Sequence, residues 1–182
     1  MTTDISSAST MEEVLKCYPG AQRTLFKRYH IGGCSSCAFQ AGETLEQICS
    51  RNNHLDPAEV LAHLKSSHEE DEQMQLAPPD LHLLLKGPTP PKLLDVRTHE
   101  EWDAVRIEGA VRMSQETMQE ILGKWPREEL VVIIDHHGAQ GLDAAAYFHG
   151  QGFKNIRCLR GGIDAWSQEV DPSLPRYTLD RS

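Results

Sequence analysis

The sequence lacks the features that favour binding to a polyanion or a membrane. Its 182 residues include 18 Lys and Arg against 27 Asp and Glu, a formal net charge of −9 at pH 7. Nucleic acids and anionic lipids attract basic surfaces, so we expect neither as a partner. No apolar run approaches the roughly 20 residues that span a bilayer. The first ten residues are polar and lack the apolar core of a secretory signal, which predicts a cytoplasmic protein.

Cysteine is scarce beyond the first third of the chain. Four of the five cysteines lie within the first 49 residues, and the fifth is Cys158. An odd number in a reducing compartment argues against a structural disulfide framework. It favours thiol redox chemistry, metal binding or plain burial. The 39% apolar and 25% charged residues are typical of a folded globular protein.

The pattern predicts two domains joined by an acidic linker. Residues 67–77 begin with Ser67-His68-Glu69-Glu70-Asp71-Glu72 and run into prolines, a composition that buries little surface. We therefore expect a small helical domain over residues 1–66, a linker over 67–77 and a second domain over 78–182.

Short helices are expected in the first domain. Capping boxes at Thr10 and Thr44 each precede apolar residues at helical spacing. A helix after Pro19 is predicted to bury Leu25, Phe26 and Tyr29 and to end at Gly32-Gly33. A fourth helix is predicted to begin near Pro57.

Strands and helices alternate in the second domain. Apolar runs at residues 93–96, 131–134 and 156–159 are predicted strands, separated by helical patterns. The run Val131-Val132-Ile133-Ile134 is typical of a strand buried on both faces. The fold class expected is α/β, a parallel sheet with helices on both faces, preceded by a small all-α domain.

The strongest chemical motif in the first domain is Gly32-Gly33-Cys34-Ser35-Ser36-Cys37. Two cysteines at this spacing can close a small disulfide or hold one metal ion. Cys34 and Cys37 are therefore the candidate catalytic residues, without a cofactor. The alternative is a zinc or iron–sulfur site made by Cys17, Cys34, Cys37 and Cys49, although their spacing matches no standard ligand pattern. For Cys17 and Cys49 we favour burial in the core.

Residues 10–66 resemble the DUF1858 domain, a small helical module found near hybrid-cluster proteins and described as a redox-disulfide domain. The resemblance rests on a Tyr-Pro after the first helix, the glycine-rich turn into the CxxC motif and the Thr-Leu-Glu helix that follows. It implies thiol-disulfide activity in which one of Cys34 and Cys37 attacks and the other resolves the mixed disulfide. The expected partner is a protein that carries a thiol or a persulfide.

Residues 78–176 resemble rhodanese domains. The matching segments are Leu94-Asp95-Val96-Arg97 with Glu100-Glu101-Trp102, Ile107-Glu108-Gly109-Ala110-Val111, Gly152-Phe153-Lys154-Asn155-Ile156 and Arg160-Gly161-Gly162-Ile163-Asp164-Ala165-Trp166. They occur in the family's order and at its spacing. Arg106 and Glu108 stand where the family usually has His and Pro.

The rhodanese resemblance also locates a degenerate active-site loop. The family pattern C-x-x-G-x-R-S corresponds here to Asp135-His136-His137-Gly138-Ala139-Gln140-Gly141. Asp135 then stands at the persulfide cysteine and Gln140 at the arginine, so conventional sulfurtransferase activity is expected to be absent. The loop and the following helix start form a cradle of N–H groups suited to negative charge. We predict that the Asp135 carboxylate accepts hydrogen bonds from this loop.

Several other residues allow both a structural and a functional interpretation. His136 and His137 are expected in a solvated loop in preference to a metal site. Cys158 is expected in the core, and sulfur transfer through it is the weaker alternative. Arg97 is expected to form a structural ion pair with Glu100 or Glu101. The competing function is a metal or iron–sulfur sensor whose rhodanese-like part is an interaction module.

Overall fold

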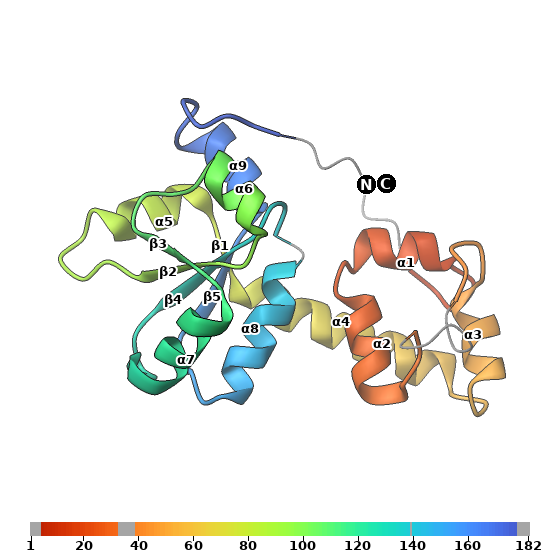
Figure 1. Ribbon diagram of the computed structural model, residues 1–182. Coiled ribbons are helices and arrows are strands. Elements are labelled where there is room, and N and C mark those ends of the chain that lie inside the picture. Colours follow the sequence, from red (N-terminus) through yellow and green to blue (C-terminus); the bar gives the residue numbers. More distant parts are fainter. Residues whose placement is uncertain (1–4, 33–38, 139, 178–182) are drawn as a thin grey trace. The chain divides into compact units, whose positions relative to one another are not determined.

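The computed structural model describes residues 5–32, 39–138 and 140–177 (Figure 1). The chain divides into two compact units, Met1–Gln73 and Met74–Ser182. Within the described residues, no helix is both long and apolar enough to cross a membrane.

The first unit is helical, as predicted. Both capping boxes form, because the hydroxyls of Thr10 and Thr44 accept from the third backbone N–H of the helices that they precede. An isolated antiparallel bridge joins these two threonines and so fixes one helix start against the other. The helices in the described part are α1 (Met11–Cys17), α2 (Ala21–Tyr29), α3 (Leu45–Arg51) and α4 (Pro57–Met74).

Helix α2 ends earlier than predicted and buries a different set of residues, which are Ala21, Thr24 and Leu25. It stops at Tyr29, and His30 adopts a left-handed conformation with φ of 56°. Leu25 is fully buried, but Phe26 is 50% exposed, so the prediction that Phe26 is a core residue is wrong.

The segment expected to be a linker, residues 67–77, is mostly helical. Helix α4 runs through it to Met74, and a two-residue strand follows. Asp71 explains the difference, because its side chain is buried and forms an ion pair with Arg23 of α2 at 2.5 Å. The hydroxyls of Thr24 and Ser67, which lie 2.7 Å apart, also join α2 to α4. The acidic run therefore has a packed side that its composition does not reveal.

The second unit contains a five-stranded sheet in the order β1-β5-β4-β2-β3, in which every adjacent pair is parallel. Its strands are β1 (Gln75–Leu76), β2 (Lys92–Asp95), β3 (Ala110–Arg112), β4 (Val131–Ile134) and β5 (Ile156–Leu159). Its helices are α5 (Pro78–Leu85), α6 (His99–Ala104), α7 (Gln115–Lys124), α8 (Gln140–Gly150) and α9 (Gly162–Glu169). The three predicted strands correspond to β2, β4 and β5.

Helices pack on both faces of this sheet, which confirms the expected fold class (Figure 1). Strand β4 is buried along its whole length, and its residues alternate between two cores. Val131 and Ile133 pack with α7 and α8, whereas Val132 and Ile134 pack with α5 and α9. The carboxyl end of β4 is thus held on both sides where the candidate site begins.

Candidate functional site

The loop that begins at Asp135 leaves the carboxyl end of β4 and leads toward α8. Beside it, β2 ends at Asp95 and pairs with β4 in register, Asp95 opposite Ile134. The chain leaves β2 toward β3 on one side and leaves β4 toward β5 on the other. In open parallel sheets, ligands bind at such a reversal of strand order. The loop therefore lies where the topology favours a site.

The carboxylate of Asp135 is turned into its own loop. Its Oδ1 accepts from the Gly138 N–H at 2.5 Å, and its Oδ2 accepts from the N–H groups of Gln140 at 2.7 Å and Gly141 at 3.0 Å. Asp135 is only 2% exposed. The prediction that this carboxylate is hydrogen-bonded by its own loop is confirmed.

Two glycines allow the loop to close tightly. Gly138 has φ of +87°, and a Cβ there would lie 2.7 Å from the Gly161 nitrogen. Gly162 has φ of +61°, and a Cβ there would lie 2.4 Å from the carbonyl oxygens of Asp135 and His136. The loop backbone consequently rests directly on the start of α9, whose amides at Ile163 and Asp164 donate to those two carbonyls.

This geometry fixes what the loop can do chemically. Backbone N–H groups at a helix start stabilise an anion, and in this loop three of them already hold a carboxylate. A carboxylate cannot accept or carry a transferable sulfur atom. At Asp135 the protein's own carboxylate therefore occupies three N–H groups of the loop.

His136 lies buried between two rings. Its ring stacks on His137 at 3.8 Å and on Tyr177 at 4.2 Å between centroids. Its Nε2 lies 3.1 Å from the Tyr177 carbonyl oxygen, and its buried Nδ1 has no hydrogen-bond partner among the described residues. Burial, assisted by His137, lowers the pKa of His136. His137 is exposed as predicted, whereas the expectation of a solvated His136 is wrong.

Arg97 is the centre of a second buried cluster. Its guanidinium pairs with Asp95, with Nη2 to Oδ2 at 2.6 Å and Nε to Oδ1 at 2.9 Å. The Tyr177 hydroxyl accepts from Arg97 Nη1 at 2.9 Å and donates to Glu101 at 2.8 Å. Burial acts to lower the pKa of Arg97, but the hydrogen bonds with Asp95 and Tyr177 outweigh it and raise that pKa. The ion pair predicted with Glu100 or Glu101 is therefore made with Asp95. The Glu101 carboxylate is reached through Tyr177, while the Glu101 carbonyl oxygen accepts directly from Arg97 Nη1 at 3.4 Å.

Sequence reasoning did not single out Tyr177. Burial, together with Glu101, raises the pKa of its hydroxyl to about 12. It joins the His136 stack to the Arg97 cluster from a segment after α9, about 40 residues along the chain from the loop. No hydrophobic period or motif marks this segment, so nothing in the sequence pointed to it.

The cysteines separate into two groups. Cys34 and Cys37 lie outside the described residues. Cys49 is fully buried, and burial raises the pKa of its thiol. Cys17 packs against the same core, and Cys158 is 1% exposed in β5. Among the described residues, no three His, Cys, Asp or Glu side chains come together as a metal site.

Comparison with known proteins gives the family. The sequence matches the rhodanese-like domain over residues 77–169, just over half of the chain. The chain belongs to the rhodanese-like domain family.

Its curated relatives include sulfurtransferases. It is 33% identical over 87 residues to a probable adenylyltransferase/sulfurtransferase, MoeZ, of Mycobacterium tuberculosis, covering 47% of this chain and 22% of the relative. It is 27% identical over 77 residues to the thiosulfate sulfurtransferase GlpE of Shewanella oneidensis, covering 42% of this chain and 76% of the relative. The aligned part thus spans about a fifth of the length of MoeZ.

Solved structures of rhodanese-like domains also resemble this chain. The human single-domain sulfurtransferase TSTD1 is 24% identical, with a TM-score of 0.47, over 53% of this chain and 95% of the other. A rhodanese-like domain protein from Staphylococcus aureus is 23% identical, with a TM-score of 0.47, over 57% of this chain and 98% of the other.

Proposed function

We propose that the protein handles thiols or sulfane sulfur at Cys34 and Cys37, in a helical module resembling DUF1858. In this proposal the rhodanese-like unit acts without a catalytic cysteine, because Asp135 stands where the family has its persulfide cysteine. The observation that supports this division of roles is the Asp135 carboxylate, which engages three N–H groups of the loop. The names of relatives such as GlpE support a role in sulfur chemistry.

Burial supports the choice of cysteines. A reactive cysteine is a thiolate that a second molecule can approach. Cys49 is buried in the core of the first unit and Cys158 in the core of the second unit. Burial disfavours both the thiolate form and the approach of a second molecule. Cys34 and Cys37 are separated by two residues, a spacing that lets one thiolate attack a partner and the other resolve the mixed disulfide.

The proposed chemistry needs only a partner protein with a persulfide or a disulfide. One thiolate of the CxxC pair attacks the outer sulfur of a persulfide, forms a cysteine persulfide and releases the partner's thiolate. With a disulfide partner, the same thiolate attacks one sulfur, breaks the partner's S–S bond, forms a mixed disulfide and releases the partner's other sulfur as a thiolate. The second CxxC thiolate then attacks the mixed disulfide, closes the Cys34–Cys37 bond and releases the partner's remaining thiolate. Electrons then pass to the partner, because the CxxC pair is oxidised as the disulfide is reduced.

Sulfur labelling of the full chain tests the proposal. The protein is incubated with a persulfide donor, alkylated and digested, and the mass of each cysteine peptide is measured by mass spectrometry. We expect one added sulfur atom on the peptide with Cys34 and Cys37, and none on the peptide with Cys158. Turnover of thiosulfate with cyanide that survives in the Cys34→Ala, Cys37→Ala double variant would contradict the proposal.

An engineered thiol tests the part played by the loop. In Asp135→Cys the new thiolate can attack the outer sulfur of thiosulfate and release sulfite, with the loop N–H groups stabilising the persulfide. We expect this variant, and not the wild type, to retain a sulfur atom at position 135. Asp103→Cys places a thiol on the exposed face of α6 and is the matched control, expected to stay unlabelled.

Metal analysis distinguishes the alternative function. Stoichiometric zinc or iron in anaerobically purified protein, lost in Cys34→Ser, would favour the metal or iron–sulfur sensor and contradict thiol chemistry. A metal-free protein whose CxxC pair oxidises and reduces reversibly would support the proposal.

A further inference from the structure

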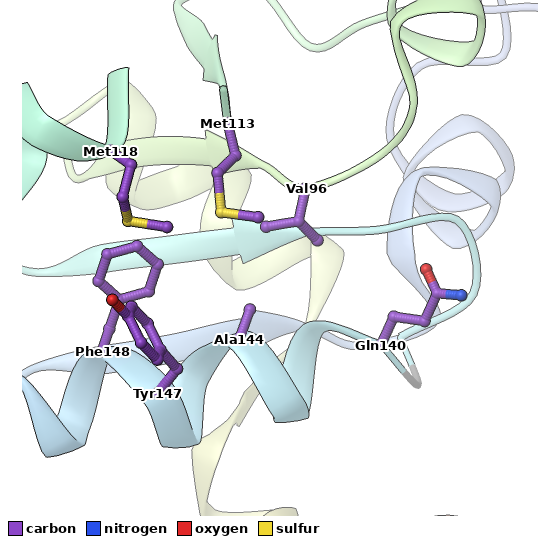
Figure 2. A pocket seen from close by; sticks show the side chains of 7 residues that line it. All are labelled: Val96, Met113, Met118, Gln140, Ala144, Tyr147 and Phe148. Atoms are coloured by element: carbon purple, nitrogen blue, oxygen red, sulfur yellow. The ribbon is translucent and has the colours of Figure 1, made fainter. Parts of the chain in front are cut away.

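We infer that the second unit binds a small uncharged organic molecule in an apolar pocket beside the Asp135 loop. The pocket has a volume of about 330 Å³. Figure 2 shows Met113 and Met118 extending toward α8, with Gln140 at one end of the pocket and the rings of Tyr147 and Phe148 at the other. The lining is completed by Val96 and Ala144.

The pocket lies where the sheet topology places ligands. Val96 follows β2 directly, and Met113 follows β3, with its N–H donating to the Asp95 carbonyl. Gln140 and Ala144 come from the helix that follows β4. The pocket therefore lies at the carboxyl ends of β2 and β4, where the strand order reverses. Met118 comes from α7, so the lining combines residues just after β2 and β3 with residues of α7 and α8, all in the second unit.

The chemistry of the lining favours an uncharged occupant. Among the described residues that line the pocket there is no lysine, arginine or histidine, and the polar side chains are those of Gln140 and Tyr147. At the neighbouring loop, the N–H groups of Gln140 and Gly141 are engaged by the Asp135 carboxylate. An anion entering the pocket would lose its hydration and gain no cationic partner, which is costly. Sulfur oxyanions and carboxylates are thus disfavoured.

Size and plasticity narrow the class further. A volume of 330 Å³ is at the lower end of the range of about 300–1,000 Å³ found for small-molecule sites. Methionine side chains adapt to irregular shapes, and their sulfur atoms make favourable contacts with aromatic rings. Tyr147 is 47% exposed, so its ring is available to a ligand. The occupant expected is a single-ring or short-chain molecule with one polar group directed at Gln140.

Methyl-labelled methionine provides a direct test. The chain has five methionines, and with ¹³C-methyl labels Met113 and Met118 report on the pocket. Met11 is fully buried in the first unit and is the internal control. With benzyl alcohol as the probe, we expect saturable shifts of the two pocket signals and none of Met11. We expect benzoate to bind at least about tenfold more weakly than benzyl alcohol, because its charge must be desolvated.

A filled pocket supplies the matched variant. Ala144→Phe puts a ring into the space, and we expect it to weaken benzyl alcohol binding at least tenfold. Ala104→Phe adds the same ring on the exposed end of α6 and should leave binding unchanged. If Ala144→Phe alters the unliganded spectrum outside the pocket, Ala144→Leu is the milder replacement. Unshifted pocket signals, equal binding of benzoate, or full binding by both filled variants would overturn the inference, whatever the outcome for Cys34 and Cys37.

Discussion

Replacing Asp135 by asparagine removes the charge of the loop carboxylate and one of its two acceptor oxygens, with little change in size. One amide oxygen remains to accept, while the new NH₂ group faces N–H groups that also donate. One or two of the N–H groups of Gly138, Gln140 and Gly141 then lose their partner. A buried donor without a partner costs about 1–3 kcal/mol, so one or two such donors should lower the unfolding free energy by about 1–6 kcal/mol. Domains are typically stable by about 5–15 kcal/mol, so the variant should still fold.

The assay uses the tryptophans, all three of which lie in the second unit. Urea unfolding followed by tryptophan fluorescence therefore reports on the unit that contains the loop. Amide hydrogen exchange should accelerate at Gly138, Gln140 and Gly141 in the variant. Asp103→Asn changes an exposed carboxylate on α6 and should alter stability by no more than about 0.5 kcal/mol. The reasoning is refuted if Asp135→Asn is as stable as that control, or if exchange in the loop stays unchanged.

Three further predictions concern the loop and its surroundings. Burial and His137 lower the pKa of His136 from 6.5, so the folded state binds fewer protons than the unfolded state. Stability should therefore fall as pH drops below about 6.5. In His136→Phe the urea midpoint should depend less on pH. The pKa of Tyr177 is raised to about 12 from 10.0, so its stabilising contribution is present below pH 10.0 and is lost as pH rises through about 12. Burial also raises the pKa of Tyr29, so absorbance titration should show more than one late tyrosinate step. The absorbance change near pH 12 should be smaller by one tyrosine in Tyr177→Phe, and an unchanged titration curve would contradict the assignment. Gly162→Ala places a Cβ 2.4 Å from two carbonyl oxygens and should cost more than about 2 kcal/mol, whereas Gly123→Ala, in open space on α7, should add about 0.4–1 kcal/mol to stability. Thermal unfolding of the two glycine variants measures this contrast, and equal midpoints would count against it.

The main strands could be predicted from local sequence, and the Asp135 loop from the resemblance to rhodanese domains. Val131 to Ile134 form an uninterrupted β-branched run. In the loop after this strand, the position of Gly138 identifies Asp135 as the residue whose side chain faces the N–H groups. Strands β1 and β3 were missed because two or three residues are too few for a detectable alternation.

Residues that depend on distant partners could not be predicted. Asp71 belongs to an acidic run typical of solvent, yet Arg23, 48 residues earlier, accounts for its burial. Tyr177 meets His136 and Arg97 only in the folded unit. The pocket likewise joins Met113 and Met118 to α8, and separate sequence patterns do not show that these elements share a cavity.

The closed loop at Asp135 has a consequence for how the chain responds to oxidants. A loop built around a cysteine changes its charge and shape when that cysteine is oxidised or alkylated. Here the same N–H groups hold a carboxylate, which thiol reagents do not modify, and Cys158, the sole cysteine after residue 73, is buried in β5. The rhodanese-like unit should therefore keep one structure under reducing and oxidising conditions alike.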